Sequence, residues 1–158
     1  MTRLTNGQFF PHLEMAKVGG GLLILPDDLA GHFGVILIYR GSWCPYCNAQ
    51  LSAFQRASET LAALDIRVVA FSVDDEQTTQ ALIAKHHLNF PMGHSARADE
   101  VSQAIGAYVN ERPHHFQSTG FILKPDSTVL VAVYSSGAVG RLVPEDVAGL
   151  IRHIRKPD

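Results

Sequence analysis

Several features that would assign this chain to a specialised class are missing. Only two cysteines occur among 158 residues, too few for the disulfide framework of a small secreted domain. No run approaches the roughly 18 apolar residues of a membrane helix, and residues 1–11 lack the basic and apolar segments of a secretory signal. The net charge of −2 gives no excess of positive charge for nucleic acid or an anionic membrane. We therefore expect a cytoplasmic protein with neither of these partners.

The composition that remains is that of an ordinary globular protein. Apolar residues make up 46% of the chain and charged residues 18%, which is not the profile of a disordered segment. No repeat, linker or low-complexity segment interrupts the sequence. This length suits one core, so residues 1–158 are predicted to form a single domain.

The pattern of apolar residues predicts an α/β fold. Val35–Tyr39 and Ile66–Val73 are continuous apolar runs, typical of strands that are covered on both faces. Between them, apolar residues at helical spacing predict a helix over about 45–64. Two buried strands joined by a helix make a right-handed βαβ unit with parallel strands.

The other elements are predicted from shorter patterns and from turn and cap residues. They are a strand at Leu22–Leu25, read as one arm of an N-terminal hairpin; a helix over about 75–87; an extended piece at Phe90–Met92; a helix capped by Ser95 with Val101, Ile105 and Tyr108 on its apolar stripe; a polar loop over 111–119; a hairpin of Phe121–Leu123 and Thr128–Tyr134; and a last helix opening at Pro144.

The two cysteines stand where chemistry is expected. Cys44 and Cys47 lie at the junction between a predicted strand and a predicted helix, with Pro45 at the first helical position. A helix N-terminus carries partial positive charge and free N–H donors, which favour a thiolate, and the thiolate is the reactive form of cysteine. Cys47 lies on the apolar stripe of the helix, so we expect it to be the more buried sulfur. The three-residue spacing lets the pair alternate between dithiol and disulfide.

Two other interpretations of the pair are weighed against redox use. A Cys-x-x-Cys pair is also half of a zinc site, but a closed site needs four ligands, and neither a second pair nor an obvious histidine complement is present. The cysteines could also be inert core residues. Their setting beside Trp43 and Pro45 favours the redox interpretation over both.

The stretch Tyr39-Arg40-Gly41-Ser42-Trp43-Cys44-Pro45-Tyr46-Cys47 resembles the active-site segment of the thioredoxin-like superfamily. It is more similar to the peroxiredoxin-like branch of the alkyl hydroperoxide reductase/thiol-specific antioxidant (AhpC/TSA) family. Segments 68–74, 90–92 and 120–126 follow in the order of that family's later strands. The resemblance implies a thioredoxin-like fold, with a central mixed sheet flanked by helices on both faces.

The resemblance implies two mechanisms, which the sequence leaves open. In the thioredoxin pattern Cys44 attacks and Cys47 resolves the mixed disulfide. In the peroxiredoxin pattern Cys47 aligns with the peroxidatic cysteine, and Cys44 stands where that family has Thr or Ser. Cys47 would then become a sulfenic acid with which Cys44 condenses to a disulfide.

The sequence departs from the family at two positions. Arg40 replaces a proline, and Gln117-Ser118-Thr119 stands where the family has an arginine that holds the thiolate and the peroxide. Arg40, Arg112 and Arg141 are the candidates to replace that arginine. Thr119 also falls where thioredoxins have a cis-proline beside the cysteines, a position at which peroxiredoxins commonly have Thr or Ser.

Residues near the pair are given more modest roles. Trp43 and Tyr46 are predicted to line the rim and, with Thr119, to contact substrate. His114 and His115 are interpreted as solvated loop residues rather than proton-transfer groups, and Asp74 as the start of the next turn.

The sequence is thus interpreted as a peroxiredoxin-like thiol–disulfide oxidoreductase that reduces hydroperoxides or protein disulfides through Cys44 and Cys47. The resemblance implies electrons from a thioredoxin, a glutaredoxin or glutathione, and a homodimer. No nucleotide, flavin or metal is expected, because no glycine-rich phosphate loop follows a strand. The alternatives are a redox sensor that does not turn over and a zinc-binding module.

Overall fold

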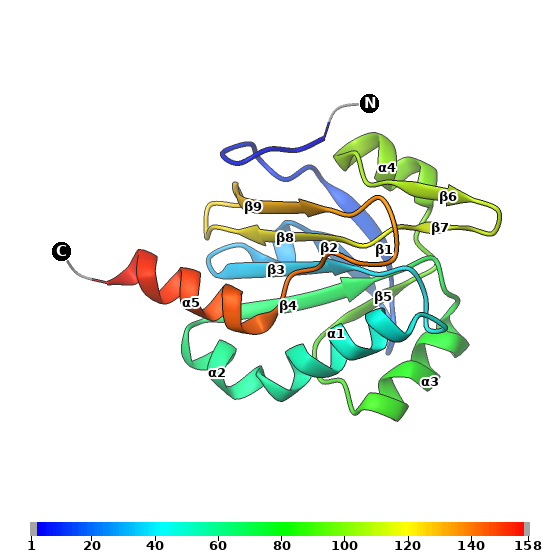
Figure 1. Ribbon diagram of the computed structural model, residues 1–158, viewed down its shortest axis with the longest axis horizontal. Helices are drawn as coiled ribbons and strands as arrows, with labels where there is room; N and C mark the ends of the chain where they lie inside the picture. Colours follow the sequence, from blue (N-terminus) through cyan, green and yellow to red (C-terminus); the bar gives the residue numbers. More distant parts are fainter. Residues whose placement is uncertain (1–2, 157–158) are drawn as a thin grey trace.

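The computed structural model describes residues 3–156, which build a seven-stranded mixed sheet in the order β2-β1-β5-β4-β3-β8-β9 (Figure 1). The strands of this sheet are β1 Leu13–Lys17, β2 Leu22–Leu25, β3 Phe33–Ile38, β4 Ile66–Phe71, β5 Met92–His94, β8 Thr119–Leu123 and β9 Val129–Tyr134. The predicted N-terminal hairpin is present as β1 and β2, and the predicted late hairpin as β8 and β9.

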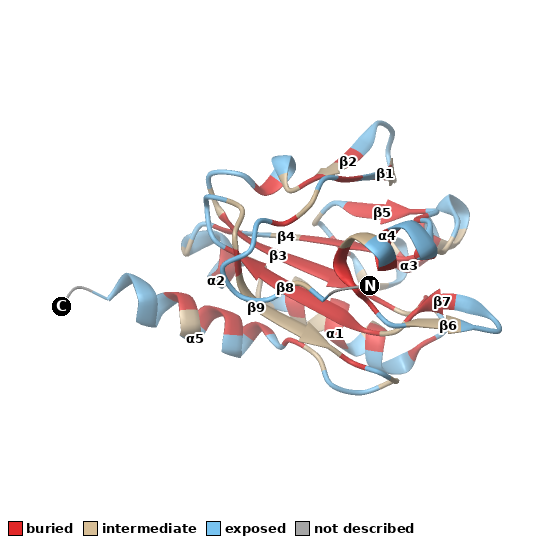
Figure 2. Ribbon diagram, turned by 90° about the horizontal axis from the view of Figure 1, so that it is seen from above, coloured by how far each residue is buried: buried red, intermediate tan, exposed pale blue. Residues whose placement is uncertain are grey.

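The middle of the sheet confirms the predicted βαβ unit. β3 and β4 run parallel with Val35 opposite Val68, and β8 pairs antiparallel with the other edge of β3. Every residue of β3 and β8 is buried, as expected for strands covered on both faces (Figure 2).

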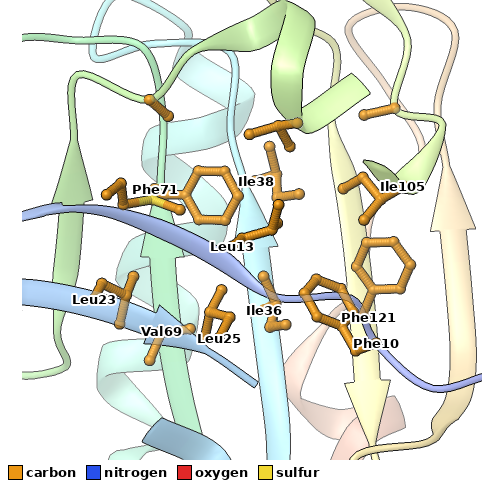
Figure 3. Packing of buried hydrophobic residues seen from close by; sticks show 14 of the residues in the cluster. Phe10, Leu13, Leu23, Leu25, Ile36, Ile38, Val69, Phe71, Ile105 and Phe121 are labelled. Atoms are coloured by element: carbon orange, nitrogen blue, oxygen red, sulfur yellow. The ribbon is translucent and has the colours of Figure 1, made fainter. Parts of the chain in front are cut away.

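Helices cover both faces of the sheet, and each face has its own core. On one face lie α1 Pro45–Arg56, α2 Ser58–Ala63, α3 Glu76–His86 and α5 Pro144–Arg155. On the other face, α4 Ala98–Ile105 packs with the N-terminal segment and β1–β2, through side chains that include Phe10, Ile105 and Phe121 (Figure 3). The 3-10 helix Asp27–Leu29 follows β2. In the described part of the chain, no helix is long and apolar enough to cross a bilayer.

The single helix predicted over 45–64 is wrong. The chain leaves the helical conformation at Ala57, whose ψ is 5°, and restarts as α2. Phe54 and Leu61 are both buried, seven residues apart, in this broken arrangement. Apolar spacing is therefore the same for one helix or for two and does not reveal the break.

The predicted helix capped by Ser95 starts later and ends sooner. Ser95 has a φ of 55° and donates its N–H to the Asp74 carbonyl, while Arg97 occupies the N-cap position. Gly106, with a φ of 83°, ends the helix, because glycine adopts this left-handed conformation at no steric cost. Tyr108 therefore lies outside the helix.

The polar loop predicted over 111–119 is mostly a third hairpin. β6 Val109–Glu111 pairs with β7 His114–Phe116, and Thr119 already belongs to β8. Phe116 is buried with its ring centroid 5.8 Å from that of Phe71. That distant contact provides burial for a segment whose local sequence is polar.

Candidate functional site

The two cysteines lie where β3 passes through a short turn into α1. Cys44 is the N-cap of α1, and its carbonyl accepts the Asn48 N–H at 3.0 Å. Pro45 follows at the first helical position, where no N–H is needed. The Cys44 sulfur accepts the Cys47 N–H at 3.3 Å, as a side-chain oxygen does at an ordinary N-cap.

Both cysteines are free thiols and both are fully buried, at 0% exposure. Cys44, which was expected to be the more exposed of the two, is thus shielded from solvent as well. The loop between β9 and α5 lies against it: Arg141 Nη2 is 3.6 Å from its sulfur, and the carbonyl of the next residue, Leu142, accepts a hydrogen bond from Gln50 on α1 at 3.0 Å. This loop is nearly 100 residues away in sequence, so local periodicity could not reveal it.

Two arginines approach the sulfur of Cys44. Arg40 Nη1 lies 3.8 Å from it and Arg141 Nη2 lies 3.6 Å from it. Burial by itself raises the pKa of the Cys44 thiol, but the hydrogen bonds from Cys47 and Arg40 and the charge of Arg141 together lower this pKa below its usual value. The third candidate, Arg112, lies exposed in the β6–β7 turn.

Cys47 is in the opposite electrostatic situation. Its sulfur accepts the backbone N–H of Arg40 at 3.3 Å. Burial, with the hydrogen bond to Cys44 as the second cause, raises the pKa of Cys47 to about 11. Of the two sulfurs, Cys44 therefore forms the thiolate more readily, and Cys47 stays a thiol near neutral pH.

A neutral acceptor fixes the Arg40 guanidinium from outside the cysteine pair. Its Nε donates to Gln117 Oε1 at 2.9 Å. Gln117 lies just before β8, in the segment where the sequence lacks the expected arginine. The amide thus positions a cation supplied by the β3–α1 turn, a role for Gln117 that the sequence did not suggest.

The Arg141 guanidinium is held by three groups. Nη1 donates to Ser118 Oγ at 2.9 Å and to Gln50 Oε1 at 3.3 Å, and Nη2 donates to the Ala138 carbonyl at 2.8 Å. Gln50, Ser118 and Ala138 were missed by sequence reasoning. They come from three separate elements, and no local pattern links them.

The rim of the site is aromatic. Trp43 and Tyr46 are 53% and 52% exposed, in agreement with their predicted place. The indole of Trp43 packs edge-on against His115, with centroids 5.0 Å apart, and the Arg40 guanidinium lies 4.9 Å from its ring centroid. A Cβ at Gly41 would overlap Trp43 Nε1, so glycine is needed for the indole to fold back.

His115 is not the solvated loop residue that was expected. It is 5% exposed, and its Nδ1 donates to the Phe116 carbonyl at 2.7 Å. Its neighbour His114 does lie near the surface, with Nε2 3.2 Å from Asp99 on α4. The two residues are neighbours in a strand, which the sequence did not suggest here, and successive side chains of a strand point to opposite faces.

Asp74 is part of the site rather than a plain turn residue. Its Oδ2 accepts the Ser42 N–H at 2.8 Å and so fixes the turn before Cys44. Burial raises the pKa of Asp74, although the hydrogen bond from Ser42 opposes this. Asp75, next in the chain, is the residue that caps α3. Tyr39 is buried nearby, and burial raises its pKa to about 12.

Thr119 lies behind the site. It is buried at the start of β8, and its hydroxyl donates to the Gln117 carbonyl at 3.2 Å. Its contact with substrate stays a prediction, as do those of Trp43 and Tyr46. Among residues 3–156, no group of three or more His, Cys, Asp or Glu side chains is placed to hold a metal ion.

Comparison with known proteins identifies the family of the chain. The model of the family described as AhpC/TSA matches residues 6–132. A peroxiredoxin of Methanothermobacter thermautotrophicus is 26% identical over 96% of this chain and 74% of its own length. A peroxiredoxin of Thermotoga petrophila is 28% identical over 88% of this chain and 66% of its own length. The chain thus spans about two thirds to three quarters of these relatives.

Solved structures share the fold. The peroxidoxin BcpB of Mycobacterium tuberculosis has a TM-score of 0.83 at 17% identity, covering 98% of this chain and 100% of that chain. The AhpC of Mycobacterium bovis has a TM-score of 0.82 at 20% identity, covering 100% of this chain and 96% of that chain. The predicted thioredoxin-like architecture is confirmed by these neighbours and by the sheet itself.

Proposed function

The chain belongs to the AhpC/TSA family, and from this premise we propose that it is a thiol peroxidase in which Cys44 attacks hydroperoxides and Cys47 resolves the product. One observation carries the assignment of roles: the Cys47 N–H, Arg40 and Arg141 all converge on the Cys44 sulfur. Thiolate is the reactive form, and these donors favour it at Cys44.

The first step consumes the peroxide. The Cys44 thiolate attacks one peroxide oxygen, an S–O bond forms and the O–O bond breaks. The electron pair leaves on the other oxygen, which takes a proton and departs as an alcohol or water. Cys44 is left as a sulfenic acid. The guanidinium groups of Arg40 and Arg141 lie beside this sulfur, where they stabilise the negative charge on the leaving oxygen.

The second step closes the pair. Cys47 loses its proton and attacks the Cys44 sulfur, an S–S bond forms and hydroxide leaves with a proton as water. The short link of one helical turn brings the two residues together, and the Cys47 N–H already contacts the Cys44 sulfur. Two electrons from an external thiol reductant then restore both thiols.

The assignment of roles is open to a direct test, because the family resemblance favours Cys47 as the attacking residue. Single-turnover reactions with an organic hydroperoxide are compared for Cys47→Ser and Cys44→Ser, with sulfenic acid trapped by dimedone and located by mass spectrometry. We expect Cys47→Ser to react at a rate close to wild type and to carry the adduct on Cys44. Reaction of Cys44→Ser alone, with the adduct on Cys47, would assign the peroxiredoxin pattern instead.

Reduction of protein disulfides is a second candidate for the same residues. The half-exposed Trp43 and Tyr46 on either side of Cys44 favour it, because large amphipathic side chains are typical of protein contacts. A hydroperoxide rate no faster than that of free cysteine, with rapid reduction of a protein disulfide, would select this function. Failure of both reactions would leave the redox-sensor interpretation. Thioredoxin, glutaredoxin or glutathione as reductant and a homodimer as assembly are part of the proposal.

A further inference from the structure

The charge around Cys44 is unbalanced. Among residues 3–156, neither Arg40 nor Arg141 forms an ion pair with an Asp or Glu side chain. The acid of this region, Asp74, directs its Oδ2 to the Ser42 N–H. When Cys44 ionises in the reduced protein, its thiolate is therefore the anion that the two guanidinium groups share.

Oxidation removes that anion and leaves the cations in place. A disulfide between Cys44 and Cys47 carries no charge. Arg40 is held by Gln117, and Arg141 by Gln50, Ser118 and the Ala138 carbonyl, so neither depends on the sulfur for its position. The oxidised site thus presents two positive charges without a counter-ion, in partly buried surroundings where their field is less screened than in water.

From this arrangement we infer that Arg40 and Arg141 select the reductant, and that it is a small thiol bearing a carboxylate. This inference rests on the proposed disulfide cycle and deepens it. The small size follows from the full burial of both sulfurs, with the loop that carries Arg141 against Cys44. The negative charge follows from the two uncompensated guanidinium groups, which attract the thiolate and the carboxylate of the incoming molecule.

The electron flow is that of ordinary thiol–disulfide exchange. The incoming thiolate forms a bond to the Cys44 sulfur, the Cys44–Cys47 bond breaks, and the electron pair leaves on Cys47, which takes a proton. A second thiolate attacks the external sulfur of the mixed disulfide, and the pair leaves on Cys44. Two small thiols are oxidised to one small disulfide, and the protein gains two electrons. The arginines attract the anion in both steps and stabilise Cys44 as the final leaving group.

The test measures how reduction depends on the charge of the thiol. Protein disulfide is prepared with diamide rather than hydroperoxide, so a missing peroxidase reaction does not affect it. Its reduction by 3-mercaptopropionate, 2-mercaptoethanol and cysteamine is followed by Trp43 fluorescence, and each rate is expressed per thiolate. The same three rates on hydroxyethyl disulfide, which is uncharged, give the intrinsic reactivities.

For each disulfide we take the ratio of the reduction rate with 3-mercaptopropionate to the rate with cysteamine. We expect this ratio to be at least about tenfold larger for the protein than for hydroxyethyl disulfide, and the difference to shrink in high salt. Arg141→Gln and Arg40→Gln should each remove most of this preference, and Arg141→Lys should retain it. The matched control is Arg97→Gln, which removes the same charge from the exposed N-cap of α4 on the other face of the sheet.

Equal charge preferences on the protein and on hydroxyethyl disulfide would overturn the inference, as would a preference that survives both glutamine substitutions. So would a protein that forms no intramolecular disulfide. The proposed peroxidase function is judged separately, by the hydroperoxide rate. If Arg141→Gln does not fold, as judged by circular dichroism, the Arg40→Gln and Arg141→Lys variants still decide the outcome.

Discussion

The contribution of Arg141 to the reactivity of Cys44 provides a sharp test of the site. Its Nη2 lies 3.6 Å from the sulfur. Two unit charges about 4 Å apart interact by roughly 1 kcal/mol in water and roughly 4 kcal/mol at the effective dielectric near a protein surface. Arg141 is half-buried and Arg40 remains in the variant, so the lower part of this range applies. We expect Arg141→Gln to lose about 1.4 kcal/mol of thiolate stabilisation, or about tenfold in the ratio of thiolate to thiol.

The sign of the pH effect follows from the same contact. The cation favours the thiolate, so its removal raises the pKa of Cys44, and a higher pH is needed for the same reactivity. Alkylation by iodoacetamide, a neutral reagent, is measured against pH in a Cys47→Ser background so that one thiol reports. At pH values well below the pKa of both proteins, the Arg141→Gln rate should be about tenfold lower. At high pH, where both proteins are thiolates, the two rates should converge.

Arg97→Gln serves as the control, because it removes an exposed charge from the opposite face and should leave the profile unchanged. Overlapping pH profiles for Arg141→Gln and its parent would refute the electrostatic account of Cys44. So would preferential alkylation of Cys47 in the protein that carries both cysteines.

Three further predictions concern the turn and the core. Gly41→Ala should displace the Trp43 indole and change its fluorescence, and an unchanged spectrum would contradict the contact. The free energy of unfolding measured in urea should fall by no more than about 1 kcal/mol, because that ring is half-exposed. Burial raises the pKa of Asp74 in the folded protein. The stability that the protonated carboxyl contributes is therefore present below the pKa of Asp74 in the unfolded chain, and it is lost as pH rises through the pKa of the folded protein. Asp74→Asn should gain stability relative to wild type at pH 7 but not at pH 3. A gain of equal size at both pH values would argue against that cause. Phe54→Ala should lower the free energy of unfolding by about 3–5 kcal/mol, measured by chemical denaturation, because the side chain is fully buried; a loss below 1 kcal/mol would show that the core closes around the cavity.

Only part of the candidate site could be predicted from the sequence. Cys44, Pro45 and Cys47 are adjacent in the chain, so their place at the start of a helix could be predicted from local rules. Arg141 contacts Cys44 across 97 residues and Gln117 contacts Arg40 across 77. An arginine that replaces the one missing from its family position can come from any element near the sulfur. The sequence contains several arginines and does not show which of them lies there.

The burial of Cys44 illustrates the same limit. A residue at a helix N-terminus is exposed unless another segment lies against it, and here the loop before α5 does so through Arg141. The β6–β7 hairpin is similar, because its polar residues form strands only when they pair with each other and Phe116 meets Phe71. Neither event leaves a periodic signal.

The sequence by itself determined the α/β class, the parallel β3–α1–β4 unit and the position of the cysteine pair at a helix start. These depend on residues close together in the chain, where spacing and backbone preference act directly. Tertiary structure alone decided which sulfur favours the thiolate, because that depends on the distances of two guanidinium groups and on the burial of Cys47. Electrostatic energy varies with separation in space, and separation in space is set by the packing of distant elements.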